Sequence, residues 1–156
     1  MKKKIVIIAF VCLFIDQITK IFITNNWRLY EKKEIIENFF NITYVQNKGG
    51  AWGILNGNVF FLIVVTLVAL ALICRFIFKE ENISKIDCVV YGMLLGGIMG
   101  NLIDRTFHKY VIDFLDFKIF NYDFPVFNIA DIFIVISIFI MIITCFRGDK
   151  NENGSR

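Results

Sequence analysis

The chain has 156 residues, of which 57% are hydrophobic and 20% charged, and its mean hydropathy is +0.65. A water-soluble domain of this length cannot bury so much apolar surface, so the composition indicates a small integral membrane protein and excludes a disordered chain. With 17 basic and 14 acidic residues the charge is too balanced to indicate a nucleic-acid partner. The four cysteines and the single histidine form no cluster, so we expect no metal site, disulfide framework or cofactor.

Four apolar segments have the length that a helix needs to cross a membrane. The first begins with Lys2-Lys3-Lys4 and an apolar run, as a signal peptide does. No small-x-small cleavage site follows it, so we expect an uncleaved first helix. The predicted helices cover about 5–23, 59–78, 86–104 and 126–146.

Four spans place both termini on the same side, and the triple lysine favours the cytoplasm for that side. The segments 24–58 and 105–125 then lie outside. They contain the runs IIENFFNITYVQN and VIDFLDFKIF, whose β-branched and aromatic residues predict short strands. We therefore expect residues 1–156 to form a single domain of the mainly α class, a four-transmembrane-helix bundle with a small β-rich extracytoplasmic cap.

Charged and amide side chains inside membrane helices cost free energy, so their presence indicates a structural or functional role. Asp16 and Lys20 are four residues apart on one helix face, where an ion pair would tie the first helix to its neighbours. Asn101, Asp104 and Arg105 share a face of the third helix. They could bond to one another, or they could present a fork of donors to a peptide backbone.

Two carboxylates, Asp113 and Asp131, reach the outer boundary from adjoining segments. Alternation places Asp113 on the face opposite Ile112 and Phe114, and Pro125 suits the start of the fourth helix. Two close carboxylates in a low dielectric hold one proton between them, which is the condition that an aspartic hydrolase needs. On the pattern alone an interfacial cap is the favoured interpretation of each, because caps are common.

Two other functions fit the same segments. A Ser–Lys protease would use Ser137 with Lys20, although a serine at this depth more often donates its hydroxyl to its own helix. A non-enzymatic four-span transporter subunit or assembly factor would need only the helix-packing ridge of Gly92, Gly96 and Gly100 and the interfacial acids.

Five motifs follow one another in a fixed order along almost the whole chain. Any one of them is weak, but five in order on a four-span chain are specific. They read Asp16-Gln17-Ile18-Thr19-Lys20, Asn47-Lys48-Gly49-Gly50-Ala51-Trp52, Gly96-Gly97-Ile98-Met99-Gly100-Asn101-Leu102-Ile103-Asp104-Arg105, Val111-Ile112-Asp113-Phe114 and Phe127-Asn128-Ile129-Ala130-Asp131.

In these motifs the chain closely resembles the bacterial lipoprotein signal peptidases, also called signal peptidase II. The resemblance implies an intramembrane aspartyl endopeptidase of the bacterial cell membrane, with its active site at the outer face. It would cleave the signal peptide from prolipoproteins just before a cysteine that carries diacylglycerol. The expected partners are lipidated prolipoproteins, membrane lipids and globomycin-type inhibitors, and the expected state is a monomer.

The resemblance also implies roles for nine residues. The catalytic pair falls on Asp113 and Asp131. The substrate-binding positions fall on Asn47, Asn101 and Arg105, and the supporting positions fall on Asp16, Lys20, Asp104 and Asn128.

Two positions depart from the family pattern. Gly50 stands where family members often have Ala, and Lys109 stands where a Gly commonly lies two residues before the Val that opens the Val111-Ile112-Asp113-Phe114 motif. Neither position is that of an acidic residue, but both lie in turns next to candidate site residues, so we expect the conformation of these turns to differ from the family pattern.

Overall fold

The computed structural model describes residues 1–50, 54–120 and 122–153, with side chains in the last helix up to position 145. The predicted cap segments 24–58 and 105–125 therefore include positions outside the description, among them Trp52 of the second motif. The described elements, in chain order, are α1 (Lys2–Asn26), β1 (Lys32–Ile36), β2 (Phe40–Asn47), α2 (Val59–Lys79), α3 (Lys85–His108), β3 (Val111–Ile119), β4 (Tyr122–Asp123) and α4 (Ile129–Asn153).

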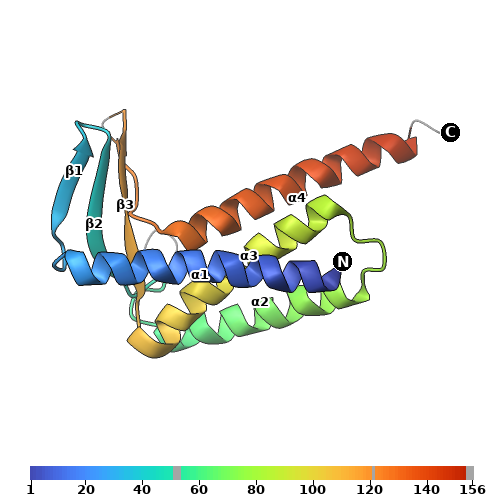
Figure 1. The fold of residues 1–156 in the computed structure, drawn as a ribbon, viewed down its shortest axis with the longest axis horizontal. Coiled ribbons are helices and arrows are strands. Elements are labelled where there is room, and N and C mark those ends of the chain that lie inside the picture. Colours follow the sequence, from blue (N-terminus) through green and yellow to red (C-terminus); the bar gives the residue numbers. More distant parts are fainter. Residues whose placement is uncertain (51–53, 121, 154–156) are drawn as a thin grey trace.

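The helices run roughly lengthwise beside one another, and the sheet stands across one end of them (Figure 1). Three helices, α1, α2 and α3, are long and apolar enough to cross a membrane, and α4 adds an apolar stretch over Ile129–Cys145. Their apolar side chains face largely outward: Ile77 is the buried residue of α2, while Phe60 is 81% exposed. Such an exterior suits lipid rather than water, and it confirms a mainly α membrane fold with a small antiparallel sheet.

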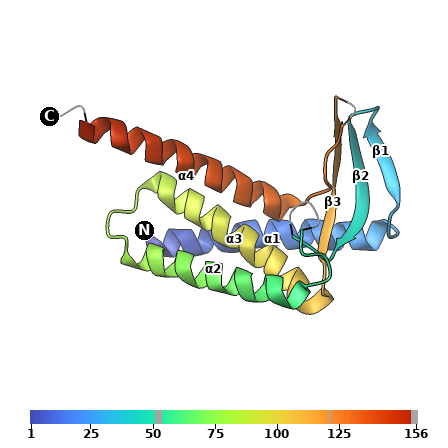
Figure 2. The ribbon, with the colours of Figure 1, turned by 180° about the vertical axis from the view of Figure 1, so that it is seen from behind.

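Helix α3 lies between α1 and α4 because its glycines allow close approach on two faces. The view from behind shows α3 crossing the bundle between its neighbours (Figure 2). A Cβ at Gly96 would lie 2.6 Å from the Ala9 carbonyl oxygen of α1, and one at Gly97 would lie 2.6 Å from the Ala130 carbonyl oxygen of α4. The predicted ridge is therefore a packing surface, and it brings the polar residues of three helices together.

Helix α4 begins at Ile129, three residues later than the sequence predicts, and Pro125 precedes it in irregular backbone. The reason is a capping box: the Asn128 side-chain oxygen accepts from the Asp131 N–H at 3.1 Å, and the Asp131 carboxylate accepts from the Asn128 N–H at 3.1 Å. Phe127 still pairs with Leu115 of β3 in extended form. Asp131 consequently lies in the first turn of α4, beside the sheet.

The sheet is antiparallel in the order β1-β2-β3-β4. One face of β2 and β3 packs on the end of α1, where Ile112 and Phe114 join Ile23 and Tyr44 in a buried cluster. Because successive strand residues point to opposite faces, Asp113 is turned away from this cluster, which confirms the alternation argument.

Lys109 joins α3 to β3 with φ 67° and ψ 15°, the left-handed conformation. Glycine adopts such a φ without steric cost, whereas a residue with a Cβ such as lysine is strained there. Lys109 adds one bond from its ammonium to the Thr106 carbonyl oxygen at 3.0 Å. Gly50 is different, because a Cβ there would meet the Ile54 carbonyl oxygen at an ordinary 3.5 Å.

Replacing Lys109 by glycine should raise the free energy of unfolding by about 1 kcal/mol relative to Lys109→Ala, because only glycine relieves the left-handed strain. Unfolding of the detergent-solubilised protein measures the difference. The alanine variant is the matched control, since it also lacks the ammonium contact. A glycine variant no more stable than the alanine variant would contradict the strain at this turn.

Candidate active site

Asp113 lies on β3 with 2% of its surface exposed. Its carboxylate accepts the Asn47 amide at 3.0 Å on one oxygen and the Asn128 amide at 2.6 Å on the other. Asn47 is itself oriented by the Gly49 N–H, which donates to its side-chain oxygen at 2.8 Å. The Asp113 carboxyl group is therefore held from two sides by amides of the preceding strand and of the segment before α4.

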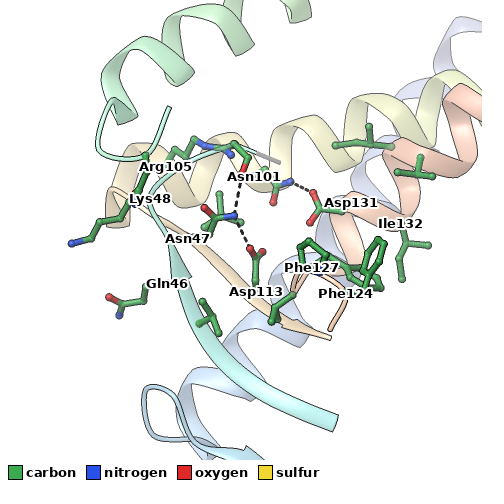
Figure 3. Close-up of a pocket in the computed structure, with 18 of the residues that line it drawn as sticks. Gln46, Asn47, Lys48, Asn101, Arg105, Asp113, Phe124, Phe127, Asp131 and Ile132 are labelled. Carbon is green, nitrogen blue, oxygen red and sulfur yellow. Dashed lines mark hydrogen bonds between the residues drawn. The ribbon is translucent and has the colours of Figure 1, made fainter. Parts of the chain in front are cut away.

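Asp131 approaches the same place from α4. Its carboxylate accepts the Asn101 amide of α3 at 2.8 Å and the Asn128 backbone N–H at 3.1 Å. Asn128 thus contacts both acids, through its side chain to Asp113 and through its backbone to Asp131. Figure 3 shows the two carboxyl groups directed into one cavity.

The cavity between the sheet and the helices has a volume of about 1070 Å³. One part of its wall is polar and contains both acids, four amide side chains, a lysine and a guanidinium, and the rest is mainly apolar. A cavity of this kind can hold a polar backbone beside an apolar chain. Its polar lining includes Asn47, Asn101, Arg105, Asp113 and Asp131, and its apolar lining includes Phe124, Val126, Phe127, Ile132, Val135 and Ile136.

Burial is the main reason that the pKa of Asp113 is raised to about 7, and the negative charge of Asp131 adds to the effect. The amides of Asn47 and Asn128 act in the opposite direction by stabilising the carboxylate. A carboxyl group with this pKa can give and take a proton near neutral pH, as acid–base chemistry requires.

Arg105 faces the cavity from the last turns of α3. One terminal nitrogen donates to the Gly49 carbonyl oxygen at 3.1 Å, and its buried Nε has no hydrogen-bond partner among the described residues. Its guanidinium therefore keeps donors available on the cavity side. Arg105 does not bond to Asn101 or Asp104, so the first of the two interpretations of this motif is wrong for the arginine.

Asn101 and Asp104 bond instead to Lys20, which is 1% exposed. Its ammonium lies 2.9 Å from carboxylate oxygens of both Asp16 and Asp104 and donates to the Asn101 side-chain oxygen at 3.0 Å. The predicted Asp16–Lys20 pair is thus present, and it forms part of a larger buried cluster. The cluster therefore places two acidic side chains around one ammonium.

Gln17 belongs to this cluster, although the sequence analysis gave it no role. Its amide nitrogen lies 3.1 Å from Asp104 and 3.2 Å from Asp16, and 3.3 Å from the Gly100 carbonyl oxygen. An amide in an apolar run next to Asp16 was the available signal. The partners of Gln17 on α3 could not be predicted from residue spacing within a single helix.

Ser137 donates its hydroxyl to the Phe133 carbonyl oxygen at 2.7 Å, as expected for a serine that bonds to its own helix. The ammonium of Lys20 is fully engaged with the groups described above. The geometry therefore gives no support to a Ser137–Lys20 protease.

Known proteins match the chain over almost its full length. A family model described as signal peptidase (SPase) II matches residues 8–147. The chain belongs to the signal peptidase II family. Among its relatives, a lipoprotein signal peptidase of Staphylococcus haemolyticus (strain JCSC1435) is 40% identical over 97% of this chain and 99% of its own length. A lipoprotein signal peptidase of Bacillus pumilus (strain SAFR-032) is 42% identical over 96% of each chain.

Solved structures agree with this family assignment. One, described as a bacterial membrane enzyme, superposes with a TM-score of 0.88 at 36% identity and covers 94% of this chain and 90% of its own. As a signal peptidase II family member with membrane-spanning apolar helices, the chain is a multi-pass bacterial membrane protein of a peptidase family. Membership of a peptidase family disfavours the transporter-subunit hypothesis.

The raised pKa of Asp113 predicts a pH-dependent cost in stability. The folded state binds this proton more tightly than the unfolded state, so wild type should lose stability as pH rises from about 4 to about 7. Asp113→Asn removes this dependence. The stability difference between the variant and wild type should therefore shift in the variant's favour, by up to about 4 kcal/mol, between pH 4 and pH 8.

Thermal unfolding across this pH range measures the shift. Hydrogen bonds lost in the variant contribute an offset that does not depend on pH. Asp123→Asn, on exposed β4, is the matched control and should track wild type at every pH. Parallel curves for wild type and Asp113→Asn would contradict the assignment.

Proposed function

We propose that the protein is an intramembrane aspartic endopeptidase that removes the signal peptide from diacylglyceryl-modified prolipoproteins, cutting just before the lipidated cysteine. One observation carries the aspartic mechanism. Asp113 and Asp131 face one cavity and are bridged by Asn128. The substrate class follows from the family and from relatives named lipoprotein signal peptidases.

In the proposed reaction Asp113 is the acid and Asp131 the base. Asp113 is the more buried of the two, and Asp131 stands in the first turn of α4, where the helix dipole stabilises negative charge. Asp131 takes a proton from water, whose oxygen bonds to the scissile carbonyl carbon, while Asp113 gives its proton to the carbonyl oxygen. The tetrahedral gem-diol then collapses: one of its hydroxyls returns a proton to Asp113, the C–N bond breaks, and the leaving nitrogen takes the proton from Asp131, so both acids regain their starting states.

The lining of the cavity suits this substrate. Arg105, Asn47 and Asn101 would bind the peptide backbone, with the free guanidinium donors of Arg105 reaching carbonyl oxygens. The apolar wall formed by Ile132, Val135 and their neighbours would contact the lipid chains or the signal helix. We expect globomycin-type inhibitors to occupy the same cavity, and we expect the monomer to be the active unit.

The proposed orientation places both termini in the cytoplasm and the cavity at the outer face. The N-terminus and the end of α4 lie at the end of the bundle away from the sheet (Figure 1). Lys2, Lys3 and Lys4 lie at that end, with Lys79 and Lys85 in or beside the α2–α3 connection, and basic residues favour the cytoplasmic side. The dyad would then meet its peptide bond near the outer interface, where the diacylglyceryl chains remain in lipid.

Asp113→Asn and Asp131→Asn should each lower cleavage of a diacylglyceryl-modified precursor at least about 100-fold, because each removes one of the two proton-transfer groups. The assay uses the purified protein in detergent, with and without globomycin. Asp116→Asn is the matched control, since Asp116 lies on the same strand but pairs with Lys32 at 2.7 Å, and it should cleave at the wild-type rate. Turnover near normal in either dyad variant would reject the aspartic mechanism.

A further inference from the structure

The residue that precedes Asp113 is bound by a group from another element. The backbone N–H of Ile112 donates to an Asp104 carboxylate oxygen at 3.1 Å. Asp104 belongs to α3 and is 1% exposed. A buried acceptor thus fixes the backbone of β3 one residue before the proposed catalytic acid.

The residue that precedes Asp131 is bound in the same way. The backbone N–H of Ala130 donates to an Asp16 carboxylate oxygen at 3.0 Å. Asp16 belongs to α1, is fully buried, and lies 114 residues away along the chain. The backbone just before Asp131 is therefore held by a buried carboxylate of α1, as the backbone just before Asp113 is held by one of α3.

Lys20 connects the two arrangements. Its ammonium is 2.9 Å from the carboxylates of both Asp16 and Asp104, and it also donates to Asn101, whose amide binds Asp131. Two buried carboxylates could not remain ionised side by side without such a cation. The Lys20 ammonium thus stabilises both of the carboxylates that accept these backbone N–H groups.

We propose that Asp16, Lys20 and Asp104 form a positioning clamp that fixes the backbone immediately before each dyad carboxylate and so sets the distance between the two acids. The proposal rests on the proposed aspartic mechanism. The clamp residues do not line the cavity, so they act through Ile112 and Ala130 rather than on the substrate.

The segments that carry the dyad need such support. Asp113 follows the strained turn at Lys109, and Asp131 follows the irregular backbone at Pro125. Each acid is the third residue of its element, so little regular structure precedes it on its N-terminal side. An error of about 1 Å in the position of a catalytic group can cost about 100-fold in rate, so fixing these two backbone positions matters for catalysis.

The clamp is separable from the packing of the helices. The close contact of α1 with α3 is made along Gly92, Gly96 and Gly100, and only at Gly100 does it involve a clamp residue, Asp16; a Cβ at Gly92 or Gly96 would lie 2.6 Å from other atoms of α1. Removing one clamp carboxylate also leaves Lys20 paired one-to-one with the other, so the variant has no buried cation without an acidic partner. Single clamp variants should therefore fold.

The test compares two substitutions at each carboxylate. Asp104→Asn keeps a side-chain oxygen for the Ile112 N–H, whereas Asp104→Leu fills a similar volume without an acceptor, and both have the same charge. The Asn variant should keep kcat within about 10-fold of wild type, while the Leu variant should lose about 100-fold in kcat with KM nearly unchanged. Asp16→Asn and Asp16→Leu should behave in the same way.

The pH profile separates positioning from a merely structural role. The charge of Asp131 helps to raise the pKa of Asp113, so a looser pair should move the falling limb of the kcat profile to lower pH. The Leu variant should show this displacement relative to its Asn partner. Since the two variants have equal charge, the displacement reports the position of the acids.

Gln17→Leu is the control for stability, because it removes bonds to both clamp carboxylates but leaves the Ile112 and Ala130 bonds in place. It should lower the unfolding temperature, keep kcat within about threefold of wild type and leave the pH limb unmoved. Equal kcat values and equal pH limbs for the Asn and Leu variants would overturn the clamp. Loss through KM alone would do the same. Failure of the proposed function would instead appear as activity that persists in Asp113→Asn or Asp131→Asn.

Discussion

The buried ammonium of Lys20 is the interaction on which the sheet end of the bundle depends. A charge removed from water must be paired, and here its partners come from α1 and α3 within 3.0 Å. Those partners in turn bind backbone or side-chain groups of β3 and α4. One cation and its partners thus link α1, α3, β3 and α4 through a connected set of buried contacts.

The elements joined by these contacts carry the two acids of the candidate active site. β3 turns Ile112 and Phe114 toward α1 and Asp113 toward the cavity, and the capping box of α4 places Asp131 in its first turn. Burial and a neighbouring negative charge then raise the pKa of Asp113 to about 7. A cavity with one polar and one apolar wall suits the proposed hydrolysis of a peptide bond next to lipid, because the bond and the acyl chains need different surroundings.

Much of this could be predicted from the sequence, because apolar length and strand alternation are local signals. These two signals predicted the four apolar helices and the face of β3 on which Asp113 lies. The partners of Asn101, Asp104 and Arg105 could not be predicted, since helical spacing shows which residues share a face but not what lies opposite it. The late start of α4 was missed because Pro125 is an ordinary first helical residue, whereas the capping box and the pairing of Phe127 depend on tertiary contacts.

The central claim is that Asp113 keeps a proton near neutral pH beside the negative charge of Asp131, and infrared spectroscopy of the protonated carboxyl groups tests it most directly. The account predicts one carboxyl group per molecule that loses its proton with a midpoint near pH 7. This signal should be absent from Asp113→Asn and displaced to lower pH in Asp131→Asn, where the neighbouring charge is gone. A spectrum without a carboxyl group titrating in this range, or one unchanged in both variants, would contradict the raised pKa of Asp113.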